Sequence, residues 1–232
     1  LSEVPCVRVR EVSAVLLLSL VSAASVCRAG ELRADQDDAD LHAIARVGQR
    51  VAWVVGDRGV AWTTRDGGRT WSLVPLPGRI ACRSVCFLSN RVGWSGGNDE
   101  RPGHSRGVLL STRDGGATWQ SINTPLGRLS HVRFFDLKRG VLVGGGSEEH
   151  PTGVLETADG GRTWQAVKGT ASDDWRTAAF SSDQAGVVAG GGLRFGTWAN
   201  GAILESDPQS RGRRAWWGSA VSEGGLGWLV GD

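Results

Sequence analysis

Acidic side chains that could act as a catalytic pair occur in several segments, at Asp99, Glu100, Glu148, Glu149, Asp173 and Asp174. Glycoside hydrolysis needs two carboxylates held at a defined separation, and no spacing in the sequence pairs any two of these six. His150 follows Glu148 and Glu149, but a metal site would need further ligands at fixed spacing. The sequence therefore predicts no catalytic residue, no metal and no cofactor, and it leaves enzymatic activity undecided.

Cys82 and Cys86 are the cysteines outside the N-terminal segment. On one continuous strand their Cα atoms would lie about 13 Å apart, which is beyond the reach of a disulfide. A bulge or a bend before Val85 would bring them together, so a disulfide stays open as the alternative. Buried free thiols are the favoured interpretation.

Three loops of different length could form a recognition surface, in residues 97–106, 146–152 and 192–200. Variable loops on a rigid scaffold are the usual place for binding. The side chains expected to line this surface are Arg101, His104, His150, Arg194, Phe195 and Trp198. The alternative for each of them is a solvated loop residue without a specific role.

The elements that must position these loops come from a repeat. The motif Ser/Thr-x-Asp-x-Gly-x-Thr-Trp occurs in residues 64–71, 112–119 and 157–164, with tryptophans 48 and 45 residues apart. A second marker, in which glycines stand beside Val or Trp, recurs in residues 51–57, 93–97, 140–146, 186–192 and 227–232. A period of about 40–50 residues with several short strands is typical of a β-propeller.

Each unit is expected to supply four strands, as the third unit illustrates. Residues 129–135 predict the innermost strand, 141–143 the second, 154–157 the third and 163–167 the outer one. The Asp159-Gly160-Gly161 turn joins the last two, because Asp-Gly between β-prone runs is a strong hairpin signal. The fold class predicted is all-β, a propeller of four-stranded blades.

The propeller is expected to cover residues 41–232, in blades at about 41–78, 79–127, 128–170 and 171–216 and a partial fifth at 217–232. The fourth unit lacks the motif. Residues 203–207 are expected to form its third strand, and residues 208–214 stand where the turn should be. Four units and part of a fifth predict an incomplete ring.

The N-terminal residues 1–29 have the pattern of a secretory signal peptide: Arg8 and Arg10, then an apolar run, then small residues. The alternative is a buried N-terminal helix. Residues 30–40 are a polar linker, and the expected location is the periplasm, the cell envelope or the extracellular space. No membrane span is expected after signal removal, and a net charge of +2 does not indicate nucleic-acid binding.

The motif resembles the Asp-box, also called the bacterial neuraminidase repeat, and together with the second marker it is similar to the photosystem II assembly/stability factor family over residues 41–232. We expect the box residues to be structural, the Asp accepting turn N–H groups and the Trp packing across the hairpin. These residues are Asp66, Gly68, Thr70, Trp71, Asp114, Gly116, Thr118, Trp119, Asp159, Gly161, Thr163 and Trp164. Sialidases share the box but use a Tyr nucleophile, and this chain contains no Tyr.

Two functions follow from these observations. The first is an exported, non-catalytic propeller that binds a protein or peptide partner, as the resemblance to an assembly factor implies. The alternative is a carbohydrate-active enzyme or a carbohydrate-binding propeller, with a glycan as ligand and no Tyr-dependent sialidase chemistry.

Overall fold

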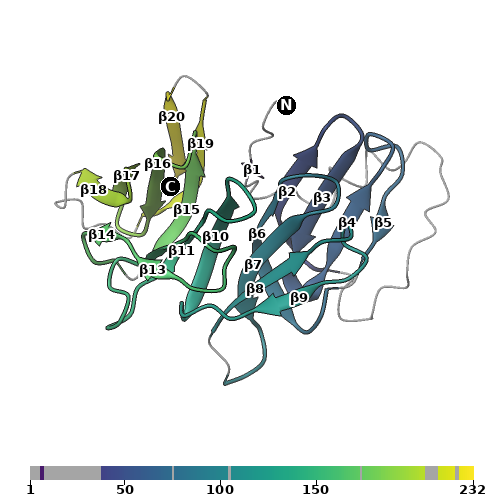
Figure 1. Ribbon diagram of the computed structural model, residues 1–232, viewed down its shortest axis with the longest axis horizontal. Coiled ribbons are helices and arrows are strands. Elements are labelled where there is room, and N and C mark those ends of the chain that lie inside the picture. The colour runs from purple at the N-terminus through teal and green to yellow at the C-terminus, as the bar shows by residue number, and fades with distance from the viewer. Residues whose placement is uncertain are drawn as a thin grey trace.

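Strands that follow one another along the chain build successive sheets in the computed structural model (Figure 1). It describes residues 6–7, 38–74, 76–103, 106–172, 174–206, 214–222 and 225–232. Within these residues the helical element is a single turn, η1 (Asp57–Gly59). The predicted all-β fold of four-stranded blades is confirmed, and its ring is incomplete.

The first sheet has the order β1 (Cys6–Val7), β2 (Leu41–Val47), β3 (Val51–Gly56), β4 (Ala61–Thr64) and β5 (Ser72–Leu73). The second is β6 (Ile80–Phe87), β7 (Gly93–Asp99), β8 (Gly107–Thr112) and β9 (Gln120–Ile122). The third is β10 (Arg128–Phe134), β11 (Gly140–Gly145), β12 (Val154–Thr157) and β13 (Gln165–Ala166). We call these sheets the first, second and third blades.

The fourth blade has the order β14 (Lys168–Gly169), β18 (Ala202–Ser206), β17 (Phe195–Ala199), β16 (Ala185–Gly190) and β15 (Trp175–Phe180). A fifth sheet contains β19 (Trp216–Val221) and β20 (Gly227–Gly231). Of the predicted signal peptide, the described residues are Cys6–Val7, which pair with β2. The rest of residues 1–37 lies outside the described part of the chain.

The fourth blade differs from its sequence-based prediction. Residues 195–199 are not a loop but the third strand, and residues 202–206 form the fourth strand rather than the third. Asn200 and Gly201 make the tight turn between them, with φ angles of 48° and 75°. Positive φ at two successive residues is what Asn-Gly hairpins provide. This short turn takes the place of the repeated Thr-x-Asp-x-Gly-x-Thr-Trp motif, for which we keep the name Asp-box as a label. The outer edge of β18 pairs in parallel with β14.

The inner strands β2, β6, β10, β15 and β19 lie beside one another in chain order (Figure 1). Side-chain hydrogen bonds link some of them directly. Ser84 Oγ accepts a hydrogen bond of 3.2 Å from the backbone N–H of Val132. Thr177 and Ser219 share one of 2.8 Å between their hydroxyl groups. The blades are therefore joined through their innermost strands.

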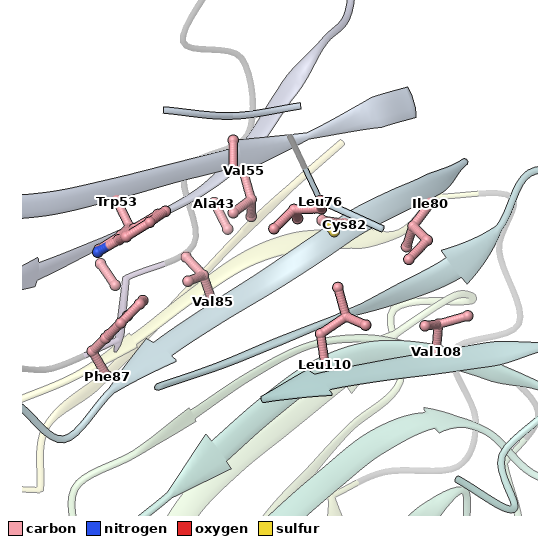
Figure 2. Close-up of a cluster of buried hydrophobic side chains, with 12 residues drawn as sticks. Ala43, Trp53, Val55, Leu76, Ile80, Cys82, Val85, Phe87, Val108 and Leu110 are labelled. Atoms are coloured by element: carbon pink, nitrogen blue, oxygen red, sulfur yellow. The ribbon is translucent and has the colours of Figure 1, made fainter. Parts of the chain in front are cut away.

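Apolar clusters fill the spaces between neighbouring blades. Between the first two blades, Trp53 and Val55 face Val85 and Phe87 (Figure 2). The rings of Trp53 and Phe87 stack with centroids 5.2 Å apart. Equivalent clusters lie between the second and third blades and between the third and fourth. Since each blade buries its apolar faces against its neighbours, no blade has a core of its own.

Cys82 and Cys86 are both free and buried in β6, so the interpretation as free thiols is confirmed. Burial raises the pKa of the Cys82 thiol to about 12, because a thiolate there would lose its hydration. No helix in the described residues has the length and apolar character needed to cross a membrane.

We expect both buried thiols to resist alkylation in the folded protein at mildly alkaline pH, because the thiolate is the reactive form. Iodoacetamide labelling followed by peptide mapping should detect adducts at Cys82 and Cys86 only after unfolding in guanidinium chloride. Equal labelling rates in the folded and unfolded states would contradict the burial of these thiols.

Candidate functional site

Each inner strand contains one β-bulge near its beginning. The extra residues lie between Leu41 and Ala43, between Cys82 and Ser84, and at the equivalent places in β10, β15 and β19. They form what we call the bulge row: His42, Arg83, Ser130, Arg176 and Trp217. Bulges re-aim side chains and are over-represented beside functional sites, so this row is our candidate site.

A glycine of the second strand opposes every bulge, and these glycines belong to the second marker of the sequence. The residue before each bulge pairs with Gly56, Gly97, Gly144, Gly190 or Gly231. If any of these glycines carried a Cβ atom, that atom would lie 1.8–2.3 Å from a backbone carbonyl oxygen. This oxygen belongs to the inner strand or to the residue that precedes the inner strand. Only glycine leaves room for this close approach of the two strands. The bulge in the inner strand therefore explains why the second marker contains a glycine at this position.

Asp57 holds the first two members of the bulge row together. Its Oδ1 lies 2.8 Å from His42 Nε2 and 3.3 Å from Arg83 Nη2. Burial of Asp57 raises the pKa of its carboxyl, but the hydrogen bond from His42 and the positive charge of Arg83 outweigh this effect. The pKa therefore lies below its usual value, and Asp57 is an anion that links the first blade to the second.

Asp174 performs the same task between the third and fourth blades. It accepts a hydrogen bond of 2.8 Å from Arg128 Nη2 and one of 2.9 Å from Arg176 Nε. The Arg176 guanidinium also lies 4.2 Å from the ring centroid of Trp217. The indole N–H of Trp217 in turn donates to Asp232 Oδ1 at 3.0 Å.

The bulge row can bind hydrogen-bond acceptors. The side chains of Arg83 and Arg176 are 32% and 27% exposed. A guanidinium has five N–H donors in a fixed plane, and the contacts with carboxylates use only part of them. The remaining donors suit the carboxylates and carbonyl groups of a peptide, and Trp217 adds a partly exposed aromatic face.

The loop residues singled out from the sequence lie on different blades. Arg101 is exposed and donates to Asp99. His150 lies between β11 and β12, and its buried Nδ1 has no hydrogen-bond partner in the described part of the chain. Arg194 lies 5.5 Å above the ring of Trp175. None of these contacts joins one predicted residue to another.

The other three predicted loop residues differ in placement. His104 lies outside the described residues. Phe195 and Trp198 are in strand β17, and Trp198 is 2% exposed, because its indole packs into the cluster between the third and fourth blades. Trp198 is therefore a core residue and does not stand on a loop surface.

Reasoning from the sequence missed the bulge row, although a signal was present. In three inner strands the bulged residue stands four positions before a phenylalanine: Arg83 before Phe87, Ser130 before Phe134 and Arg176 before Phe180. Aligning these three inner strands on their phenylalanines would have placed Arg83, Ser130 and Arg176 in one column.

The three Asp-boxes form closed hydrogen-bond networks. In the second box, Asp114 Oδ1 accepts from the Thr118 N–H at 2.9 Å and Oδ2 accepts from the Thr118 hydroxyl at 2.6 Å. The Thr112 hydroxyl oxygen also accepts from the N–H of Gly116 at 2.8 Å. Asp66 and Asp159 make the same bonds with Thr70 and Thr163. These bonds lower the pKa of Asp66 and of Asp114 to about 2.

The second box also contacts the preceding blade. The Trp119 ring meets Trp53 of the first blade edge-on at 5.9 Å and Phe87 of its own blade at 6.1 Å. A Cβ atom on Gly116 would lie 2.1 Å from the Trp53 ring. Trp164 approaches Phe134 of its own blade edge-on at 6.2 Å, and Trp71 of the first box is half-buried. Within the described residues, no three His, Cys, Asp or Glu side chains are grouped so that they could hold a metal ion.

Comparison with known proteins supports the fold. No family model matches the chain, and no curated protein matches it. The chain is similar to the solved structure of YCF48 bound to D1 peptide, with 22% identity and a TM-score of 0.60 over 79% of this chain and 59% of that one. It is also similar to an ancestral GH74 enzyme, with 16% identity and a TM-score of 0.57 over 80% of this chain and 28% of the enzyme. The chain thus spans less than two thirds of either protein.

The glycines opposite the bulges should not tolerate a side chain. In Gly144→Ala the new Cβ would lie 1.8 Å from the Arg128 carbonyl oxygen, so we expect a loss of about 2 kcal/mol or more in the free energy of unfolding. The matched control is Gly127→Ala, where a Cβ meets nothing within 4 Å, with an expected change of about 0.5 kcal/mol or less. Urea unfolding of both variants would test this, and equal stabilities would contradict the steric role.

The box carboxylates should make stability depend on acid pH. Their folded-state pKa is about 2 for Asp66 and Asp114, below the ordinary value of 3.8. Their contribution is therefore complete above pH 4 and is lost as the pH falls through about 2. We expect Asp114→Ala to lower the urea midpoint at neutral pH, and the difference from the parent chain to shrink toward pH 2. Glu149→Ala, at an exposed loop position, is the control, and an unchanged midpoint in Asp114→Ala would argue against the structural role.

Proposed function

We propose that this protein is a non-catalytic propeller scaffold that binds a protein or peptide partner through the bulge row. The observation that carries the proposal is that each inner strand aims one bulged residue at the same end of the blades. Two of these residues are partly exposed arginines. Bulges disrupt the strand ladder locally and are over-represented next to active sites, which supports a role of this row in binding.

The arrangement of charges suits a peptide. Asp57 and Asp174 position the guanidinium groups of Arg83 and Arg176, so little side-chain freedom is lost when a ligand binds. Arginine recognises carboxylates in a bidentate manner and also donates to carbonyl oxygens. The likeness to YCF48 bound to D1 peptide supports a peptide as ligand, since that protein shares the fold.

The alternative function is carbohydrate binding or cleavage. It is favoured by the aromatic face of Trp217 beside the carboxylates of Asp174 and Asp232, and by the likeness to a GH74 enzyme. Asp174 and Asp232 each accept a hydrogen bond from a neighbouring side chain. A panel of soluble polysaccharides, assayed for binding and for release of reducing ends, would separate this function from the first.

Export and the domain boundaries belong to the same proposal. We infer that residues 1–29 direct the chain out of the cytoplasm and that the propeller at 41–232 acts in the periplasm, the cell envelope or the extracellular space. The pattern of Arg8, Arg10 and the following apolar run supports this.

Peptide binding can be tested by selecting from a random peptide display library on the immobilised protein. We expect enriched peptides to bind with at least tenfold lower affinity to Arg83→Ser and Arg176→Ser, because each change removes charge-assisted hydrogen bonds. Serine is a suitable replacement, since Ser130 occupies the equivalent bulge in the third blade.

The matched control is Arg162→Ser, which removes the same charge from an exposed residue of the third Asp-box. It should leave the affinity unchanged. Enriched peptides that bind equally well to all three variants would show that the bulge row is not the binding site.

A further inference from the structure

A groove of about 340 Å³ opens between the third and fourth blades. Its apolar walls include Phe135, Val141 and Trp198. Its charged lining residues are Arg139, Glu156, Asp159 and Asp183. We call it the blade 3–4 groove. It lies at the ends of β10 and β15 that are opposite to the bulge row, because it contains residues of the turns that follow these strands.

The corresponding place between the first and second blades provides an internal comparison. A groove of about 490 Å³ lies there, and Arg65 is its charged lining residue. Thr63 pairs with Trp53 in the first blade as Glu156 pairs with Val141 in the third. Glu156 therefore occupies the position of Thr63, whose hydroxyl donates a hydrogen bond to the Ala52 carbonyl. The same position in the fold has acquired a carboxylate.

The fourth blade explains why the groove is open. Its third and fourth strands are joined by the short Asn200-Gly201 turn, where the second blade places the Gly115-Gly116 loop of its Asp-box. A Cβ atom on Gly201 would lie 3.6 Å from Glu156 Oε2. The carboxylate of Glu156 thus reaches toward a bare glycine at the tip of the next blade.

Glu156 is half-buried, and its carboxylate has no hydrogen-bond or ion-pair partner among the residues that the structure describes. Arg139 is the groove's cation, and it is engaged by Asp136 and Asp183. Asp159 is engaged by Thr157 and Thr163 of the box. A carboxylate without a partner can accept charge-assisted hydrogen bonds from a cation that enters the groove.

We propose that the blade 3–4 groove binds the guanidinium or ammonium group of a basic side chain from a partner protein, with Glu156 as its counter-ion. The methylene stem of an arginine or lysine would lie against the partly exposed Phe135, as such stems cover apolar surface elsewhere. The three carboxylates of the lining outnumber the single arginine, so the groove selects positive charge. This site is independent of the bulge row, and its failure would leave the proposed function untouched.

The test uses the folded chain and titrates N-acetyl-arginine amide while following the indole N–H of Trp198 by ¹H–¹⁵N correlation spectra. This N–H donates to the Asp183 carbonyl at the edge of the groove. We expect a saturable shift with the arginine probe and none with N-acetyl-citrulline amide, which has the same shape without the charge. Glu156→Gln should weaken binding at least tenfold, which is about 1.4 kcal/mol.

Two further variants keep the test decisive. Glu149→Gln removes the same charge from an exposed loop and should leave the affinity unchanged. Arg139→Gln removes the competing cation beside Asp183 and should raise the affinity several-fold, a gain that misfolding cannot produce. Absence of a shift with the arginine probe, equal binding of citrulline, or equal losses in Glu156→Gln and Glu149→Gln would overturn the proposal. Binding of spermidine but not of the arginine probe would show that the groove does not take its ligand from a protein side chain.

Discussion

The close approach of each bulged inner strand to a glycine of the second strand is the constraint on which the other features depend. It occurs in all five sheets, with the virtual Cβ of the glycine no more than 2.3 Å from a carbonyl oxygen. This contact sets the register of the two strands, and the register decides which residues face the neighbouring blades. It also aims His42, Arg83, Ser130, Arg176 and Trp217 toward one end of the blades. The packing between blades and the candidate site therefore have the same origin.

The Asp-boxes act at the opposite ends of the strands and in the outer part of the blades. Each box closes its turn with an ionised aspartate, and in the second blade Gly116 and Trp119 also contact Trp53 of the preceding blade. The fourth blade replaces the box with the Asn200-Gly201 turn. The wall that a box would supply is therefore missing, and a groove with the unpaired Glu156 opens in its place. A change of turn type in one blade has thus changed the chemistry of its interface.

Most of the fold could be predicted from the sequence, because the repeat and the Asp-Gly turns report local geometry directly. The bulges could not be predicted from alternation, since one extra residue shifts the pattern without leaving a characteristic residue type: His42, Arg83 and Ser130 have little in common. The prediction of a loop at residues 192–200 was wrong because the fourth unit lacks the Asp-box that marks the turn in the other blades. The Asn200-Gly201 pair between two β-prone runs was the stronger turn signal. Trp198 was expected on a loop for the same reason, although it packs in the core.

The net charge of +2 conceals an uneven distribution of charge. Positive charge is in excess at the bulge row: Asp57 is paired with Arg83, and Asp174 is paired with Arg128 and Arg176. In the blade 3–4 groove negative charge is in excess, with three carboxylates and one arginine. A net charge this small adds little overall steering of charged partners, so the proposed recognition rests on contacts made within a few ångströms. Both sites meet this requirement, because each holds its charges in a fixed geometry between two blades. In both proposals, the charged groups that would select a ligand lie at the interfaces between repeats, where the blades differ, and not within the repeat that they share.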